Sequence, residues 1–369
     1  MFIKGTFLSI DIKALLHNFI FFRSKIKRKT KIVGVVKAFS YGHEASVIAK
    51  ALEKNKVDYF GVAYVQEGVS LRKAGITTPI LVFHPQAHDI EQCIDYQLEP
   101  SIYSFRILAI FLKLMSVRDL KDYKIHLKFN TGMNRLGFEI KDSKKIIEII
   151  TQDNYLKVAS IFSHLVASED LKESKFTNTQ VKKYKQITAF FEDNLPYSFI
   201  KHIANSTGVL NYPDFHFDMV RIGIGLYGYA NDIKWTAKLK NVAKLYSIIS
   251  QIHTLEKGES VGYNRAFIAN KMTRVATVPI GYADGIPRRW SKGVGFFTIN
   301  GKKAIILGNV CMDMIMIDIT DIDCKEGDQV SVFDNQNTLE ELATRTGTIS
   351  YELLTDISIR VPRIVINNK

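Results

Sequence analysis

The chain has 369 residues, 46% of them hydrophobic, which is enough to bury a large core in two or three domains, or in one large α/β domain with an appendage. Its three cysteines, Cys93, Cys311 and Cys324, form no CxxC pair, so we expect reduced thiols and no metal rather than a disulfide framework or a zinc cluster. The formal net charge of +13 would suit nucleic acid, an anionic membrane or an anionic small molecule, but the lysines are scattered and the densest cluster, 25–31, lacks interleaved aromatic rings, so we do not expect nucleic-acid binding.

The stretch 1–22 is the only one that could be taken for a signal peptide. Lys4, Asp11, Lys13 and His17 interrupt its apolar residues, and no small-residue cleavage site follows. No later run approaches the ~18 apolar residues that a membrane span requires. We therefore expect a cytoplasmic protein that does not bind a membrane.

The first two-thirds of the chain alternates short β-branched runs with longer amphipathic patterns, the rhythm of parallel strands joined by crossover helices. One of these helices, Tyr64 to Lys73, is expected to end at Gly75, where a left-handed cap would stop it. The expected strands are Lys31 to Val36, Tyr59 to Ala63, Ile80 to Phe83, Leu98 to Ser101, Lys124 to Phe129, Val158 to Phe162, Phe199 to Ile203 and His216 to Val220. Eight such units predict an α/β fold with a (β/α)8 barrel.

After Tyr229 the pattern changes to strands separated by glycine-bearing turns, so we expect a barrel domain over 1–233 and a β-rich domain over 234–369. Residues 1–10, and Phe7 to Ser9 in particular, are a candidate strand of the second domain. The expected strands of that domain are Leu239 to Glu256, Met272 to Ile280, Gly295 to Leu307, Met314 to Ile319 and Gln329 to Phe333.

Polar residues that directly follow the barrel strands are candidates for a site, because active sites of such barrels lie at the carboxyl ends of the strands. Lys37 ends an apolar strand, where partial burial would make its amine nucleophilic, although an amine that reaches solvent is the simpler interpretation. The loop RIGIGLYG from Arg221 to Gly228 could close its amides around a phosphate or be an ordinary turn. Asn205 to Thr207 could bind an anion or cap a helix.

Three further features stay ambiguous when each is taken alone. His164 could be a general base or a structural histidine, and a metal ligand is the weakest choice because no partner lies at ligand spacing. The segments Val261 to Arg265 and Asn309 to Asp313 read as polar turns, with Tyr263 as either a half-buried strand tyrosine or a catalytic phenol.

Nine motifs in order along the chain remove this ambiguity. Together they resemble the alanine racemase family over nearly the full length, which is far more specific than any one motif. The motifs are VVKAFSYGH (35–43), HLKFNTGMNRLGF (126–138), IFSHLVASED (161–170), HIANSTGVL (202–210), MVRIGIGLYG (219–228), VGYNRAF (261–267), GYADGIPR (281–288), GNVCMDMIMID (308–318) and TISYELL (348–354).

The resemblance implies an enzyme that interconverts L-alanine and D-alanine with pyridoxal 5'-phosphate, supplying D-alanine for peptidoglycan. Lys37 matches the lysine that holds the cofactor and acts as base on the D face, and Tyr263 matches the base on the L face. Because the counterpart of Tyr263 comes from the other subunit in the family, a head-to-tail homodimer with two shared sites is implied. Arg221 matches the arginine that faces the pyridine nitrogen.

The remaining positions follow from the same motifs. The cofactor-binding set that the resemblance implies is Lys37, Tyr41, His164, Asn205, Ser206, Arg221, Gly223, Ile224 and Tyr351. The substrate-binding residues are Arg135 and Met312, and the supporting residues are Lys128, Tyr282 and Asp313.

The sequence departs from the family pattern at a few positions. Asn130 replaces a common aspartate, Phe39 and Ser40 replace the commoner Asn-Ala, Glu44 replaces a glycine and Asn309 replaces a common arginine. None of these removes a catalytic group. Asn130 and Asn309 are expected near Lys128, which is carbamylated in some members, so that modification is in doubt for this chain.

Three other functions remain open at this point. A pyridoxal-phosphate amino-acid decarboxylase would share the fold, but such enzymes lack a face-opposed tyrosine in a VGYNR context. A racemase of broader specificity that also accepts serine would share every motif. A non-catalytic cofactor carrier would need Lys37 but not Tyr263.

Overall fold

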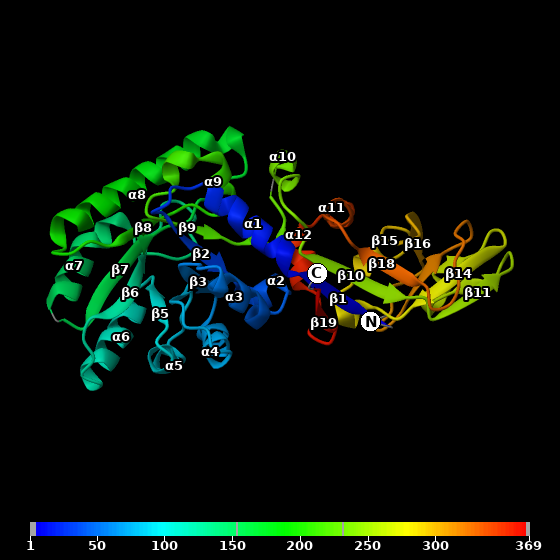
Figure 1. Cartoon of the computed structure of the whole chain (residues 1–369), viewed down its shortest axis with the longest axis horizontal. Helices are drawn as coiled ribbons and strands as arrows, with labels where there is room; N and C mark the ends of the chain where they lie inside the picture. The colour runs from blue at the N-terminus through cyan, green and yellow to red at the C-terminus, as the bar shows by residue number, and fades with distance from the viewer. Residues whose placement is uncertain (1–4, 153, 231, 367–369) are drawn as a thin grey trace.

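The structure is a computed structural model that describes residues 5–152, 154–230 and 232–366. A barrel surrounded by helices lies at one end of the long axis, and a separate β-rich domain lies at the other (Figure 1). Helix α1 (Ile12–Ser24) runs from the junction along the barrel, and both described ends of the chain lie in the sheet of the second domain.

Eight parallel strands form the barrel in the order β8-β7-β6-β5-β4-β3-β2-β9. The amide of Asp218 donates to the carbonyl of Lys201, and the amide of Arg221 donates to the carbonyl of Ala204, each at a distance of 3.0 Å. These bonds bring β9 against β8 and nearly close the barrel. The strands are β2 (Lys31–Val35), β3 (Tyr59–Val62), β4 (Ile80–Val82), β5 (Glu99–Ile102), β6 (Tyr123–Lys128), β7 (Leu156–Phe162), β8 (Ile200–His202) and β9 (Met219–Ile222). The predicted (β/α)8 barrel is confirmed.

The barrel helices cover the outside of the sheet with one apolar face each. Helix α8 (Ser174–Asn194), for example, buries Val181, Tyr184, Ile187 and Phe191 at helical spacing. The other helices of this half are α2 (Lys37–Tyr41), α3 (Ala45–Lys54), α4 (Val65–Lys73), α5 (Ile90–Asp95), α6 (Phe105–Val117), α7 (Ser143–Gln152) and α9 (Ser206–Asn211), and α10 (Ile233–Thr236) follows the last strand. Helix α4 ends as expected, with Gly75 at a φ of +90°. Among the described residues, no helix has the length and apolar character needed to cross a membrane.

The second domain is built on a nine-stranded sheet in the order β11-β14-β17-β16-β15-β18-β10-β1-β19. Its strands are β1 (Phe7–Asp11), β10 (Ala243–Ile248), β11 (Gln251–Leu255), β14 (Thr273–Val278), β15 (Phe296–Ile299), β16 (Lys302–Leu307), β17 (Ile315–Asp318), β18 (Gln329–Phe333) and β19 (Arg363–Ile366). A separate small pair, β12 (Ser260–Val261) and β13 (Phe267–Ile268), flanks the VGYNR turn, and α11 (Gln336–Arg345) and α12 (Ser350–Thr355) lead back toward the barrel.

The N-terminal strand lies inside this second sheet. Within β1, Leu8 pairs with Leu245 of β10 on one side and with Arg363 of β19 on the other. The candidate segment Phe7 to Ser9 therefore lies between two strands from the distant end of the sequence. Residues 1–4, which belonged to the same expectation, lie outside the described residues.

Three strand expectations differ from the structure. The expected strand Gly295 to Leu307 is a hairpin of β15 and β16, because Asn300 and Gly301 turn the chain with φ of +49° and +78°. Strand β9 begins at Met219 rather than His216, because Phe217 adopts a φ of +50° in a turn after a short 3-10 helix and cannot extend the strand. The expected strand Leu239 to Glu256 is divided at Ile249 and Ser250 into β10 and β11, which lie far apart in the sheet order. A short break in an apolar run is not visible in its hydrophobic pattern.

Candidate active site

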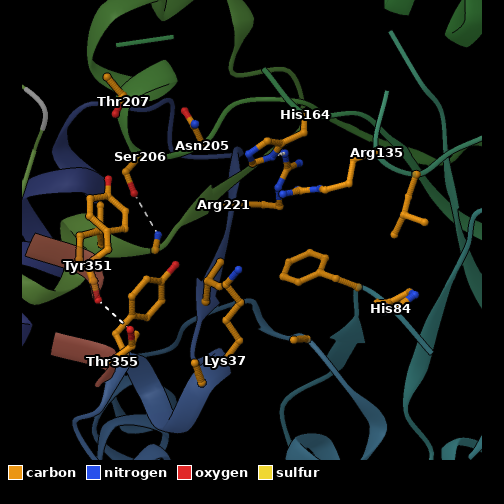
Figure 2. Close-up of a pocket in the computed structure, with 18 of the residues that line it drawn as sticks. Lys37, His84, Arg135, His164, Asn205, Ser206, Thr207, Arg221, Tyr351 and Thr355 are labelled. Carbon is orange, nitrogen blue, oxygen red and sulfur yellow. Dashed lines mark hydrogen bonds between the residues drawn. The ribbon is translucent and has the colours of Figure 1, made fainter. Parts of the chain in front are cut away.

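A pocket of about 900 Å³ opens at the carboxyl ends of the barrel strands, where the sequence placed the site. Most of the predicted residues line it together. Its lining residues are Val35, Lys37, Ala38, Tyr41, Ala63, Tyr64, Phe83, His84, Lys128, Arg135, Leu136, Phe162, His164, Asn205, Ser206, Thr207, Arg221, Gly223, Ile224, Ile349, Tyr351, Glu352 and Thr355. Figure 2 shows Arg135, His164 and Arg221 gathered on one side, with Ser206 and Tyr351 across the pocket and Lys37 between the two groups.

Lys37 enters the pocket at the start of a left-handed turn. The four residues Ala38 to Tyr41 all have φ between +51° and +59°, a conformation that costs roughly 1–2 kcal/mol per residue for side chains other than glycine. Non-glycine residues in this region persist only where surrounding contacts hold them. Burial, then the nearby charge of Arg135, lowers the pKa of the Lys37 amine, and Glu67 acts in the opposite direction.

Glu67 holds the beginning of this turn, a role that the sequence did not reveal. One carboxylate oxygen accepts from the amide of Ala38 at 2.6 Å, and the other accepts from the amides of Ala63 at 2.6 Å and Tyr64 at 3.1 Å. The bonds tie the residue after Lys37 to the end of the neighbouring strand β3. A glutamate in the first turn of a helix after a strand was the only signal in the sequence, and it reads equally well as a helix cap.

The pocket is strongly cationic. Lys37, Lys128, Arg135 and Arg221 line it, whereas Glu352 is the one carboxylate among the described lining residues and is paired with Arg289 at 2.9 Å. Burial, then the charges of Arg135, Arg221 and Lys37, lowers the pKa of Lys128 to about 8. Such a field attracts an anionic ligand and makes both lysine amines lose a proton more readily than an ordinary lysine does.

Arg221 forms the floor of the pocket, and its hydrogen bonds to described residues all go to neutral acceptors. Its Nη2 donates to His164 Nδ1 at 3.0 Å and to the carbonyls of Ser163 and Ile203 at 2.8 and 2.9 Å, while Nη1 donates to His202 Nδ1 at 2.8 Å. Because arginine only donates, both ring nitrogens must accept, so both histidines are neutral. Burial and the charge of Arg221 lower the pKa of each well below its ordinary value, in agreement with this.

Opposite the cations, the GIGLYG loop and Ser206 form a cradle of small groups. The amide of Gly223 donates to Ser206 Oγ at 3.0 Å, and the short 3-10 helix of Ile224 to Tyr227 starts there. A Cβ on Gly223 would lie 2.6 Å from the hydroxyl of Tyr41, so only glycine lets the loop come this close. Tyr351 of α12 packs near Tyr41 and completes the same wall.

Asn205 takes the helix-capping role that was the simpler of its two interpretations. Its Oδ1 accepts from the amide of Gly208 at 2.8 Å and so caps α9, and the hydroxyl of Ser168 donates to the same atom at 2.9 Å. Asn205 still lines the pocket beside Ser206 and Thr207. The cap therefore fixes the backbone that presents Ser206.

Of the five predicted residues in the second domain, Tyr351 lines the pocket of its own chain and the other four do not reach it. Tyr263 and Met312 are 75% and 52% exposed, Tyr282 is also exposed, and Asp313 pairs with Arg360 at 2.7 Å. None of the four is among the pocket's described lining residues.

Three motifs of the second domain nevertheless meet one another. Asn309 Nδ2 donates to the carbonyl of Tyr263 at 3.2 Å, and the amide of Tyr282 donates to the carbonyl of Cys311 at 3.0 Å. A Cβ on Gly281 would lie 2.2 Å from the carbonyl of Met312, so this contact requires glycine. The VGYNR, GYADG and GNVCMD segments thus form one exposed surface.

The sequence also missed lining residues at the rim and on strand β4's side of the pocket. Tyr64 and Ile349 are exposed there, and the ring of His84 lies between those of Tyr64 and Tyr103, with centroids 5.7 and 5.2 Å away. Among residues 5–152, 154–230 and 232–366, no three His, Cys, Asp or Glu side chains are grouped to hold a metal ion.

A nucleophilic lysine, a cradle for a small anion and a cationic floor at the mouth of a (β/α)8 barrel define a barrel enzyme that works on a phosphorylated or otherwise anionic ligand. Comparison with known proteins narrows this class. The N-terminal domain model of alanine racemase matches residues 10–231, and the C-terminal domain model matches residues 242–365. The chain belongs to the alanine racemase family.

Individual relatives agree over the whole length. Alanine racemase 1 of Caldanaerobacter subterraneus subsp. tengcongensis is 34% identical, over 98% of this chain and 95% of its own. The structure of alanine racemase from Clostridium difficile is 33% identical, with a TM-score of 0.93 over 100% of this chain and 98% of that one. Alanine racemase from Bartonella henselae with covalently bound pyridoxal phosphate is 32% identical, with a TM-score of 0.89 over 99% of this chain and 100% of that one.

Proposed function

We propose that this protein interconverts L-alanine and D-alanine with pyridoxal 5'-phosphate, using Lys37 and Tyr263 as the two bases. The residues of the pocket fit this cofactor. Ser206, Gly223, Ile224, Tyr41 and Tyr351, with Asn205 behind them, form a cradle suited to a phosphate. The close approach of Gly223 to the Tyr41 hydroxyl, which leaves no room for a Cβ, supports this use of the cradle most directly.

When bound, the cofactor supplies the electron sink that acidifies the Cα hydrogen of an amino acid joined to it. Lys37 holds the cofactor and, once released, accepts or returns a proton on one face of Cα. Its lowered pKa supports this role, because a base must be neutral before it can accept a proton. Tyr263 serves the other face, and the two residues exchange the roles of acid and base with the direction of reaction.

Arg221 is proposed to face the ring nitrogen, and Arg135 to bind the substrate carboxylate. A guanidinium does not give up its proton at neutral pH, so a ring nitrogen beside Arg221 stays unprotonated and the sink is moderate. A moderate sink favours return of the proton over side reactions. Met312 is proposed to border the substrate, and Lys128 to position Arg135.

The shared site requires a second subunit. Tyr263 is exposed and absent from its own pocket, while the rim of that pocket presents the exposed side chains of Tyr64 and Ile349. We propose a head-to-tail homodimer in which Tyr263 and Met312 of each chain complete the other chain's pocket, with Tyr282 and Asp313 supporting that surface. A two-fold axis then gives two equal sites.

The wider setting is also part of the proposal. The barrel and β-rich domains would divide near residue 233, with the N-terminal strand β1 as part of the second domain. The free state of Cys93, Cys311 and Cys324 supports a reducing, cytoplasmic location. D-alanine made there would supply peptidoglycan synthesis.

Mixing two inactive variants tests the shared site directly. Lys37→Ala and Tyr263→Phe should each fail to racemise, but a mixed dimer has one site with an intact Lys37 and an intact Tyr263. Random pairing of equal amounts makes half of the dimers mixed, so about a quarter of the wild-type activity should return. Fully inactive mixtures of correctly folded dimers would contradict sharing.

Proton NMR of L-alanine in D2O with the holoenzyme, together with a chiral assay, tests the reaction itself. Deuterium at Cα and the appearance of D-alanine are expected for the wild type, and Tyr263→Phe should exchange the Cα hydrogen of D-alanine only. Release of CO2 would instead point to a decarboxylase, and racemisation of serine at a comparable rate would broaden the substrate class. Cofactor binding without exchange of the Cα hydrogen would indicate a non-catalytic cofactor carrier.

A further inference from the structure

A chain of five buried polar side chains crosses the barrel interior below the pocket. Arg221 Nη1 meets His202 Nδ1 at 2.8 Å, and His202 Nε2 meets Ser160 Oγ at 2.9 Å. Ser160 Oγ meets His126 Nδ1 at 2.6 Å, and His126 Nε2 meets Glu99 Oε2 at 2.9 Å. The five residues come from five neighbouring strands, β9, β8, β7, β6 and β5, and all are buried.

The two ends of this chain fix the direction of every hydrogen bond. Arg221 can only donate, so His202 accepts at Nδ1 and carries its hydrogen on Nε2. Ser160 accepts that hydrogen and donates its own to His126 Nδ1, the only other described partner of its hydroxyl. His126 therefore donates from Nε2 to Glu99, whose carboxylate can only accept.

The charges at the two ends agree with this order. Burial acts to raise the pKa of Glu99, but the interaction with His126, the charge of Lys124 at 3.7 Å and a hydrogen bond with Tyr59 together outweigh it and leave that pKa lowered. Glu99 is thus an anion at neutral pH. Arg221 has no carboxylate among its described hydrogen-bond partners, so the chain connects a buried cation to the nearest anion along its own hydrogen bonds.

We propose that Glu99, His126, Ser160 and His202 are positioning residues that fix the orientation and the proton arrangement of Arg221. Barrel interiors are normally filled by apolar side chains, and a buried polar row is destabilising unless every member is paired. All four links are made here, which gives Arg221 a single arrangement of donors toward the pocket. The proposal rests on the proposed function in one respect only, namely that Arg221 faces the ring nitrogen of the cofactor.

The chain transmits changes because each link depends on the next. Without the hydroxyl of Ser160, His202 Nε2 and His126 Nδ1 lose their common partner. The hydrogen on His202 Nε2 then has no acceptor among the described residues, whereas hydrogen on Nδ1 would point a donor at a donor of Arg221. Arg221 therefore loses its single arrangement when the centre of the chain is removed.

The test is a comparison of two serine deletions in the holoenzyme. Ser160→Ala breaks the chain at its centre and leaves both charged ends in place. Ser101→Ala is the matched control, because Ser101 is equally buried, lies beside His126 in the strand register and has no hydrogen-bond partner for its hydroxyl among the described residues. Glu99→Gln is a second variant, which removes the charge but keeps an oxygen that can accept from His126.

Two readouts are expected to change together. Proton–nitrogen correlation NMR of 15N-histidine-labelled protein should show His126 and His202 with hydrogen on Nε2 alone in the wild type, and His202 should lose this single form in Ser160→Ala. The kcat for alanine should fall roughly tenfold to a hundredfold in Ser160→Ala, as when outer partners of an active-site group are removed, with KM nearly unchanged. Glu99→Gln should keep the tautomers and lower kcat less, and Ser101→Ala should match the wild type.

The proposal is overturned if either histidine carries hydrogen on Nδ1 or is doubly protonated in the wild type at neutral pH. It is equally overturned if Ser160→Ala and Ser101→Ala have the same kcat in an active enzyme. If the wild type does not racemise alanine at all, the proposed function fails, and the tautomers still decide whether the chain is ordered as described.

Discussion

Replacing Glu67 by glutamine tests how the left-handed turn after Lys37 is held. The carboxylate accepts from the amides of Ala38, Ala63 and Tyr64, over 2.6, 2.6 and 3.1 Å. Glutamine has one accepting oxygen, so if that oxygen keeps the bonds to Ala63 and Tyr64, its NH2 group faces the amide of Ala38. The bond that anchors the residue after Lys37 is then replaced by two opposed donors.

The size of the effect follows from the bonds that are lost. A hydrogen bond to a charged group contributes about 1.5–3 kcal/mol, and an unsatisfied amide costs about 1–3 kcal/mol more when it is buried. Glu67 is partly exposed, so water replaces some of this, and we expect a net loss of about 2 kcal/mol in the free energy of unfolding. The loss of Glu67 also removes the charge that raises the pKa of Lys37 against burial and Arg135, so that pKa should fall further.

Urea unfolding of the cofactor-free protein measures the first effect, and the pH dependence of reductive methylation of Lys37 measures the second. Glu91→Gln is the control, since it makes the same charge change in the first turn of α5, where no hydrogen bond of its side chain to the described residues is found. If Glu67→Gln unfolds at the same urea concentration as Glu91→Gln, and Lys37 titrates as in the wild type, then Glu67 does not hold the turn.

Two further changes probe the cradle and the cationic wall. Gly223→Ala should weaken cofactor binding by tenfold or more, roughly 1.4 kcal/mol, because its Cβ would lie 2.6 Å from the Tyr41 hydroxyl. The same change on a Tyr41→Phe background should weaken binding much less. Equal losses on both backgrounds, measured by cofactor titration, would rule out this contact as the cause. Lys128→Met should stabilise the cofactor-free protein by about 2 kcal/mol at pH 7, because the pKa of Lys128 lies at about 8 in the fold, below its ordinary value of 10.5. Between these two pKa values the unfolded chain binds more protons than the folded one, so the wild type gains stability as the pH rises from 8 to 10.5. The stability advantage of the variant should therefore disappear over this range. Urea unfolding at pH 7 and pH 10 measures this change, and a pH-independent difference in stability would refute the reasoning.

The strand-end rule accounts for what the sequence could predict about the site. Lys37, His164 and Arg221 each follow an apolar run, and a barrel brings such positions to one mouth wherever they lie in the sequence. Glu67 could not be found in this way, because its function depends on β3 lying beside β2 and not on its own surroundings. The polar chain was equally hidden, since Glu99 and Ser160 are isolated polar residues inside strands and become partners only when the strands curve into a barrel.

Other features depend on contacts beyond any local pattern. Strand β19 was not expected from the sequence, and its place is defined by pairing with β1. The segment Val261 to Arg265 contains the expected turn, but Tyr263 is 75% exposed and does not lie half-buried in a strand, so its catalytic role stays a prediction about the dimer. The late start of β9 depends on the backbone of Phe217, which residue type alone does not indicate.

The position of β1 also governs when the protein can finish folding as it is made. Leu8 leaves the ribosome about 350 residues before its partner Arg363. Most barrel strands pair with the next strand in the sequence, and the pairing of β2 with β9 is possible once residue 222 is made. The barrel can therefore assemble while synthesis continues, whereas β1 waits with exposed edges for β10 and then for β19. A nascent chain that stalls before residue 363 therefore carries a strand with an unpaired edge beside a completed barrel, which makes such truncated products prone to aggregate and easy for quality control to recognise.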